Sequence, residues 1–277
     1  MGIEFKVVGQ IPLDQLERGR KKKSPEFYAP QVRNKLKSLA ESVNERYGNI
    51  LDNDGRIRVA DDYDSQVINM KEAAWAQESG LDLEDYRRKK ESSSNSLAEQ
   101  AITLSLAKVL GPRFLSVRSS AWDDYENSVD NLLLDLETGN VVCGFDEVVE
   151  GYGQDGGAKK EKKIMDKFAG GGSFVKYGIK SSGEMGSGVS ISQQKNLPTF
   201  FIALNKEELA DLLENIDRPK ISVTEKKIIN EIIFSLEYQA KLMDGQSAAA
   251  SNSRLKDNLA RAVDLISVLK ERVGQEK

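Results

Sequence analysis

The chain of 277 residues contains no histidine and a single cysteine, Cys143. The missing histidine excludes Ser-His-Asp and Cys-His catalysis and the zinc sites that depend on histidine. One cysteine excludes disulfide frameworks and cysteine-based zinc sites, so we expect Cys143 to be a small core residue. Any catalysis must therefore use carboxylates, Lys, Tyr, Ser or a bound metal. A metal held by this chain alone would have oxygen ligands, which suit Mg²⁺, Mn²⁺ or Ca²⁺.

Long apolar runs are also missing. No stretch approaches the roughly 20 apolar residues that a membrane-spanning helix needs, and the N-terminal MGIEFKVVGQ lacks the layout of a secretory signal peptide. The net charge of −4 supplies no overall field that would draw the protein to nucleic acid. Basic residues cluster locally at 18–23, 87–90 and 159–163, either as solvated surface or as phosphate-facing patches. We therefore expect a cytoplasmic protein without membrane contact.

The order of the expected elements predicts a mixed α+β fold in three regions. A mostly helical N-terminal region covers residues 1–92, an α/β core covers 93–218, and a C-terminal helical hairpin covers 219–277. We expect a small central mixed sheet that contains an antiparallel hairpin and is flanked by helices, with helical additions at both termini. Apolar periodicity predicts core helices over 96–110, 159–168 and 206–216, and strands over 57–62, 114–118, 132–136, 141–149, 173–180 and 198–204.

The segment VDNLLLDLETGNVVCGFDEV, residues 129–148, has the pattern of a β-hairpin with acidic residues at its outer end. A turn centred on Thr138 and Gly139 would set Asp130 opposite Glu147. A one-residue bulge at Gly139 would set Asp130 opposite Asp146 instead. Either pairing brings two carboxylates face to face, which destabilises a sheet and costs more when the strands are buried.

Two interpretations of these acids stay open. They lie at the solvated end of the sheet and keep it soluble, or they bind a divalent cation. In the second case Glu99, on the preceding helix, would supply a further oxygen ligand. The segment Asp123-Asp124-Tyr125, directly before the hairpin, either lines such a site or forms a polar loop.

An acidic residue on a helix, an Asp that opens one strand, and a second acid on the antiparallel neighbour resemble the PD-(D/E)XK nuclease superfamily over about residues 94–205. The resemblance implies a four-stranded mixed sheet flanked by helices. It also implies Mg²⁺ held by the acids and a Lys that positions or activates water during cleavage of nucleic acid. Asp130 matches the motif Asp, Asp146 or Glu147 the second acid, and Glu99 the helix acid.

The motif lysine is absent from its usual place, because Val148 and Val149 stand two residues after the two candidate acids. In some members of the superfamily the lysine comes from a neighbouring element, and here the basic helix expected over 159–168 offers Lys160 and Lys163. Loss of this lysine is also how members of the superfamily become inactive.

The resemblance therefore implies a nuclease, a hydrolase that cleaves phosphodiesters with Mg²⁺ or Mn²⁺. Its catalytic residues would be Asp130, Asp146, Glu147 and Lys163 or Lys160, with Glu99 as an additional metal ligand. The alternative is a non-catalytic binding or scaffold protein with a nuclease-like core. Nucleic acid is the partner expected of the first, and a protein partner or self-association through the C-terminal helices is expected of the second. A vaguer resemblance to bacterial proteins with a DDY…VDN…FDEV pattern implies no function.

Overall fold

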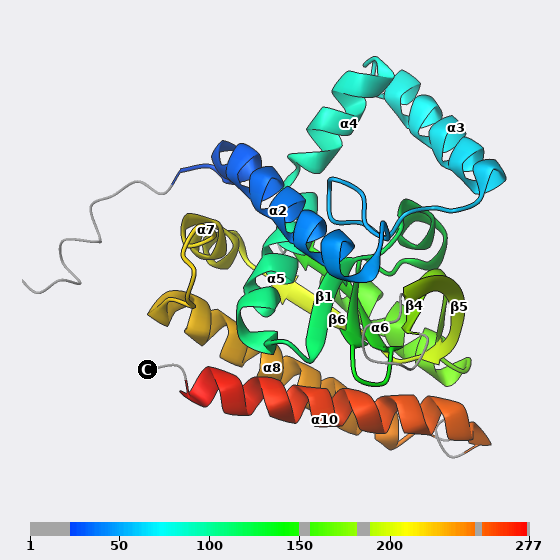
Figure 1. Cartoon of the computed structure of the whole chain (residues 1–277), viewed down its shortest axis with the longest axis vertical. Coiled ribbons are helices and arrows are strands. Elements are labelled where there is room, and N and C mark those ends of the chain that lie inside the picture. The colour runs from blue at the N-terminus through cyan, green and yellow to red at the C-terminus, as the bar shows by residue number, and fades with distance from the viewer. Residues whose placement is uncertain (1–22, 150–155, 182–188, 247–250, 276–277) are drawn as a thin grey trace, which may run out of the picture.

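The computed structural model describes residues 23–149, 156–181, 189–246 and 251–275 (Figure 1). It has the mixed α+β fold that the sequence predicts. The main sheet contains four strands in the order β1-β2-β3-β6, with β6 parallel to β3 and the other neighbours antiparallel. A separate antiparallel pair is formed by β4 and β5. The strands are β1 (Phe114–Arg118), β2 (Asn131–Asp135), β3 (Asn140–Val149), β4 (Ser173–Ser181), β5 (Val189–Leu197) and β6 (Thr199–Leu204).

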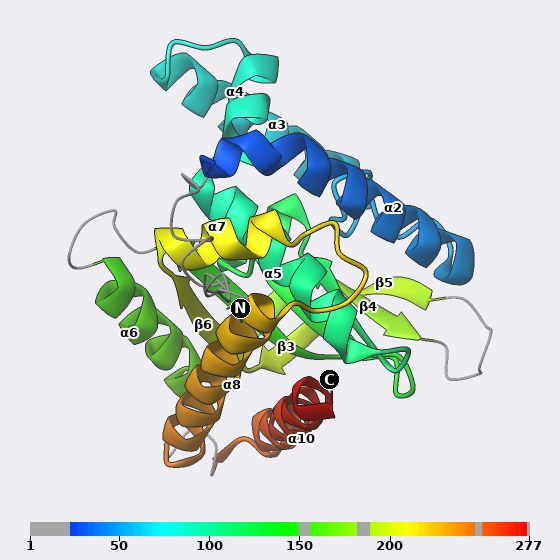
Figure 2. The ribbon, with the colours of Figure 1, turned by 90° about the vertical axis from the view of Figure 1, so that its left-hand side faces the viewer.

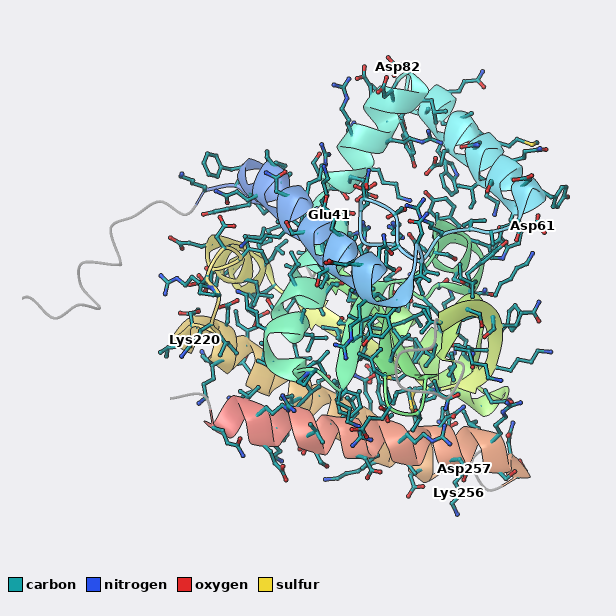
Figure 3. The ribbon with its side chains drawn as sticks, viewed as in Figure 1. Glu41, Asp61, Asp82, Lys220, Lys256 and Asp257 are labelled. Carbon is teal, nitrogen blue, oxygen red and sulfur yellow. The ribbon has the colours of Figure 1, made fainter. Side chains whose placement is uncertain are left out.

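Helices precede, separate and follow these strands, and several begin at a side chain that caps the first turn. Asp61 and Asp82 accept hydrogen bonds from the first backbone N–H groups of α3 and α4 (Figure 3). Asn205 and Ser222 form capping boxes at the starts of α7 and α8. The helices are η1 (Pro25–Tyr28), α2 (Ala29–Tyr47), α3 (Asp62–Glu78), α4 (Leu83–Glu91), α5 (Ser94–Leu110), the π-helical turn η2 (Asp123–Asn127), α6 (Gly156–Ala169), α7 (Lys206–Glu214), α8 (Val223–Asp244) and α10 (Ser253–Gln275).

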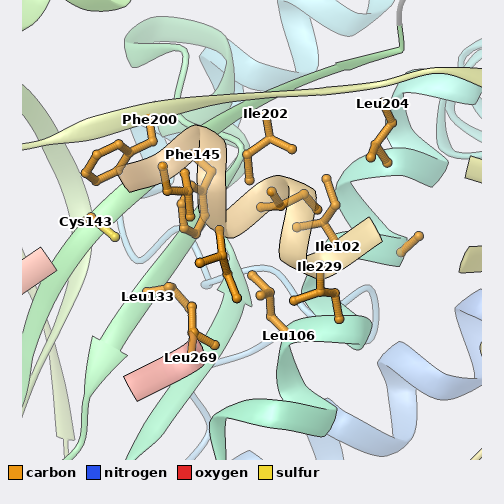
Figure 4. Packing of buried hydrophobic residues seen from close by; sticks show 14 of the residues in the cluster. Ile102, Leu106, Leu133, Cys143, Phe145, Phe200, Ile202, Leu204, Ile229 and Leu269 are labelled. Carbon is orange, nitrogen blue, oxygen red and sulfur yellow. The ribbon is translucent and has the colours of Figure 1, made fainter. Parts of the chain in front are cut away.

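One face of the main sheet packs against helices from every part of the chain. Figure 4 shows Phe145 of β3 and Phe200 of β6 in the same cluster as side chains of α5, α8 and α10. The rings of Phe145 and Phe200 lie 6.3 Å apart. The helix α5 is buried along most of its length, which explains why its sequence is apolar on more than one side. Because both C-terminal helices contribute to this cluster, they stabilise the sheet that carries the acidic hairpin.

The other face of the main sheet is covered by the β4–β5 pair and by the end of α2. Leu132 and Leu134 of β2 pack with Val175 and Tyr177 of β4 in a second apolar cluster. With both faces covered, all five residues of β2 are buried. Charged residues next to this strand are therefore held where water has little access.

The helices α3 and α4 form an arm that projects from the rest of the molecule (Figures 1 and 2). All nine residues of α4 are described and none is buried. The arm meets the core largely through polar contacts: Tyr125 of η2 donates to the carboxylate of Glu72, and Lys90 donates to the Tyr125 hydroxyl at 2.6 Å. The arm therefore has a weaker apolar attachment than the other helices.

Two secondary-structure expectations are wrong. Residues 57–62 form no strand, because this segment makes a single isolated bridge, between Ile57 and Leu51, and its last residue begins α3. The strand β5 was not expected at all. Its sequence VSISQQKNL is mostly polar and the strand is only half buried, so it lacks the apolar pattern by which the other strands were predicted. No helix within the described residues is long and apolar enough to cross a membrane.

Candidate functional site

The acidic hairpin forms, but its turn differs from the expected one. The paired positions nearest the turn are Asp135 and Asn140, so the turn covers residues 136–139 and is not centred on Thr138 and Gly139. The pairing shifts by one residue between Leu133 and Leu134, not at Gly139. A buried bulge within β2–β3 therefore sets the register, and its position depends on packing against both faces of the sheet.

Asn131 and Phe145 form the last pair of this ladder, and the same register carried one residue further sets Asp130 level with Asp146, the pairing expected of a one-residue bulge. The N–H of Asp130 also donates to the Phe145 carbonyl oxygen at 2.8 Å. The carboxylate of Asp130 then turns toward β3 and accepts the backbone N–H of Glu147 at 2.8 Å. Asp130, Asp146 and Glu147 are all buried, which contradicts the interpretation that these acids lie at a solvated end of the sheet.

Asn131 joins the strand acids to α5. Its amide nitrogen donates to Glu147 Oε1 at 2.7 Å and to the backbone oxygen of Glu99 at 3.0 Å. Its amide oxygen accepts from the Thr103 hydroxyl at 2.7 Å. This amide therefore holds β2, β3 and the middle of α5 in one arrangement, and the expected proximity of the helix acid to the strand acids is present.

Two buried arginines contact the same group of acids. Arg118, at the end of β1 and fully buried, lies 3.2 Å from the carboxylate of Glu99 and 3.0 Å from that of Glu91. Arg56 lies 3.7 Å from Glu99 and 3.2 Å from Asp124. These ion pairs join the loop before α3, the end of α4 and the turn η2 to Glu99 of α5.

The segment Asp123-Asp124-Tyr125 has three separate roles rather than forming a plain polar loop. Asp123 accepts the backbone N–H groups of Lys176 and Tyr177 and so fastens η2 to β4. Asp124 faces the acid cluster through its ion pair with Arg56, and Tyr125 contacts the arm.

The electrostatics of the cluster centre on Asp130. Burial, followed by the negative charges of Glu99, Asp124, Glu147 and Asp146, raises the pKa of Asp130 well above its ordinary value. Burial and the charge of Asp124 also raise the pKa of Glu99, although Arg118 and Arg56 oppose this increase. Because burial and these negative charges disfavour the ionised form of Asp130, an added cation would favour it.

Lysines of α6 approach the cluster from the side of η2. Lys163 donates to the hydroxyl of Ser128 at 2.7 Å, and Lys167 donates to the backbone oxygens of Asn127 and Ser128. Burial and the neighbouring charge of Lys163 lower the pKa of Lys167, whereas Asp146 and Asp130 act in the opposite direction. Lys163 was expected here, but the structure brings Lys167 within electrostatic reach of the acids. Lys160 belongs to α6, and its side chain lies outside the described residues.

The residues present supply the donor chemistry of a hard cation but not a complete ligand set. Among the described residues, no group of three or more acidic side chains is arranged to hold a metal ion. Asp130 and Glu147 each direct one oxygen to a protein donor. Mg²⁺ is usually held by one or two carboxylates together with water and phosphate oxygens, so a site for it does not require a complete set of protein ligands.

Sequence reasoning missed Lys167, Arg56 and Arg118 as members of this site, whereas Asp124 belongs to the segment that was expected either to line the site or to form a polar loop. For Lys167 a signal was present, because Lys163 and Lys167 are four residues apart and share one helix face. Arg118 is the charged residue in the mostly apolar strand FLSVR, which is also a sign of a special role. The part played by Arg56 depends on tertiary contacts that no local pattern reveals.

No protein-family model, no curated protein and no solved structure matches this chain. The functional conclusion therefore depends on the site itself.

Proposed function

We propose that this protein is a metal-dependent phosphodiester hydrolase that acts on nucleic acid. The observation that carries the proposal is the buried acid cluster around Asp130, assembled from β2, β3 and α5, with Lys167 beside it. Burying several like charges costs free energy unless a cation compensates them. The cluster is therefore better explained by a ligand than by solubility.

Mg²⁺ or Mn²⁺ would be held by Asp130 with Asp146, Glu147 or Glu99, and when bound it would lower the pKa of a water molecule and stabilise charge on a phosphate. Glu99 already has a contact with Arg118 at 3.2 Å, so it would bind the metal in place of, or in addition to, this ion pair. The helix-strand-strand arrangement of these acids and the four-stranded mixed sheet support the resemblance to PD-(D/E)XK nucleases.

Lys167 is proposed to replace the lysine that is missing after the second acid. The position two residues beyond Asp146 is Val148, which packs against the apolar core. Lys167 reaches the neighbourhood of Asp130 and Asp146 from α6 instead, and its lowered pKa suits a group that accepts or orients a proton. Lys163, bonded to Ser128, would contact a phosphate rather than the reacting water.

The test is a cleavage assay with single- and double-stranded DNA and RNA in Mn²⁺ or Mg²⁺. We expect Asp130→Asn to reduce cleavage at least about 100-fold, and Lys167→Gln to reduce it by roughly 10²–10⁴-fold, the usual contribution of a proton-transferring group. Asp166→Asn and Lys162→Gln are matched controls, because both residues are exposed on α6 and should leave the rate unchanged.

Thermal melting with and without Mn²⁺ provides a readout that does not require the correct substrate. A metal that binds the folded state raises the melting temperature by mass action, and Asp130→Asn should remove that rise. If Mn²⁺ leaves the melting temperature unchanged and no nucleic acid is cleaved, the hydrolase proposal is wrong. The alternative, a non-catalytic binding protein with a nuclease-like core, would then be favoured. Val148, which stands where the motif lysine is expected, agrees with that alternative.

A further inference from the structure

The outer face of α8 carries a stripe of exposed apolar side chains. Phe234, Tyr238 and Leu242 are spaced four residues apart and therefore lie on one side of the helix. Their exposed fractions are 73%, 56% and 39%. The opposite side of α8 is buried against β6 and α10 in the apolar core. The stripe is thus separate from the packing that holds α8 in place.

Hollows border this stripe on both sides. One, of about 380 Å³, lies between α8 and the end of β6 and is lined by Glu231, Ser235 and Tyr238 among others. The other, of about 530 Å³, lies between α8 and α10 and is lined by Lys241 and Val263 among others. A ridge with a hollow on each side is suited to a surface of the same shape, as in the isologous interface of a two-fold dimer.

The charges along α8 favour one register for an antiparallel pair formed by two copies of this helix. With a two-fold axis at the level of Leu236, Phe234 lies level with Tyr238 of the partner subunit. Glu231 then lies level with Lys241 of the partner subunit, and each contact occurs twice. Glu231 and Lys241 are both exposed, and among the described residues Glu231 makes a long ion pair, of 3.8 Å, with Lys227.

A nearby alternative axis is unfavourable. With the two-fold axis at the level of Phe234, Glu231 would meet Glu237 of the partner subunit and Lys227 would meet Lys241 of the partner subunit. Like charges that face each other across an interface oppose association. Of these two registers, the one centred on Leu236 therefore combines aromatic pairing with charge complementarity.

We propose that this protein forms a two-fold homodimer through α8, in which Phe234 and Tyr238 form the apolar centre and Glu231 pairs with Lys241 of the partner subunit. The acid cluster is built from other elements, so the dimer does not depend on the hydrolase proposal. Aromatic side chains at the centre of an interface usually contribute most of its affinity, and flanking charges determine its register.

Sedimentation velocity over a concentration series tests the dimer in the full-length protein. We expect a reversible dimer, and Phe234→Ser should weaken it at least about tenfold, since truncation of a central aromatic residue commonly costs that much or more. Thermal melts of the dilute protein should be unchanged by this substitution because Phe234 is exposed. Glu41→Lys, on the distant helix α2 (Figure 3), is a charge control that should not alter the dimer.

A charge exchange tests the register. Glu231→Lys and Lys241→Glu should each weaken the dimer several-fold, and the double variant should restore it because the two charges again attract. If each single variant weakens the dimer but the double variant does not restore it, the proposed pairing of Glu231 with Lys241 is wrong. A wild-type protein that is monomeric at every concentration, or a dimer that Phe234→Ser leaves intact, overturns the proposed interface.

Discussion

At the scale of single residues, Asp130 combines the two properties that the site requires: burial and close acidic neighbours. Both raise its pKa, so the ionised carboxylate is less stable in the folded protein than in the unfolded chain. The carboxylate nonetheless accepts a backbone hydrogen bond from Glu147, which holds it toward β3. A residue that reduces stability at neutral pH and is held in place by the fold is typical of functional sites.

Asp130→Asn should therefore stabilise the metal-free protein. A group with a raised folded-state pKa contributes stability that is present at low pH and lost as the pH rises through that pKa, and asparagine removes this loss. We expect the melting temperature of the variant at pH 8 to exceed that of the wild type by roughly 3 °C or more. The difference should disappear near pH 4, where the wild-type carboxyl is protonated in the folded state.

The exposed Asp166→Asn substitution is the control for this measurement, and it should change neither the melting temperature nor its pH dependence. If Asp130→Asn lowers the melting temperature equally at pH 4 and pH 8, the carboxylate has a structural role instead. The same variant should lose the rise in melting temperature with Mn²⁺, so that stability and metal binding change in opposite directions.

The acids could be predicted from the sequence, whereas most of their partners could not. Asp130, Asp146 and Glu147 stood out because charges interrupted an apolar alternating pattern, and Glu99 because it lies on the helix before the sheet. Their proximity follows from any antiparallel pairing of the two strands. The contacts of Glu99 with Arg56 and Arg118 depend on how a loop and a strand end pack around α5, which local patterns do not determine.

At the scale of secondary-structure elements, the strongly periodic or apolar segments were predicted well and the half-exposed ones were not. The helices α8 and α10 carry apolar residues at three- and four-residue steps, and their positions agree with prediction. The strand β5 has polar residues on both faces and was missed. Residues 57–62 have a strand-like pattern but pair with no neighbouring strand, since the end of β1 makes only one bridge to Arg56.

The arm formed by α3 and α4 should open more easily than the rest of the fold. Its attachment depends on polar contacts such as that between Tyr125 and Glu72, and on the edge-to-face contact of Trp75 with Tyr125. Elements with few buried apolar contacts open locally at lower free energy than the core does. Tyr125→Phe, which keeps the ring and removes the hydroxyl, should therefore increase hydrogen exchange in α3 and α4.

Hydrogen exchange measured by mass spectrometry checks this prediction at the level of individual segments. We expect peptides from the arm to exchange several-fold faster in the Tyr125→Phe variant, with peptides from α5 and β3 unchanged. Tyr86→Phe is the matched control, because Tyr86 lies in α4 and does not contact Glu72 through a hydrogen bond in the described structure. Faster exchange in α5 as well would show that the Tyr125 hydroxyl stabilises the whole core rather than the arm.

At the scale of the whole molecule, the buried acids fall into two groups with opposite effects on stability. Burial opposes ionisation of Glu91, yet Arg118 and Arg56 together lower its pKa to about 2. Glu91 therefore contributes stability above the pKa of an unfolded glutamate, and this contribution is lost as the pH falls toward about 2. Asp130 and Glu99 have raised pKa values, so their contribution is lost as the pH rises.

These opposite effects predict a maximum of stability at mildly acidic pH in metal-free buffer. Because the chain has no histidine, the interval from about pH 5 to pH 8 contains few ordinary titrations, and a decline there reports mainly the raised carboxyl groups. We expect the melting temperature to fall across this interval. Saturating Mn²⁺ should reduce the fall, since a cation favours the ionised acids, and Asp130→Asn should reduce it without metal. A melting temperature that rises steadily from pH 5 to pH 8 in metal-free buffer would contradict the assignment of Asp130 and Glu99 as buried, electrostatically destabilised acids.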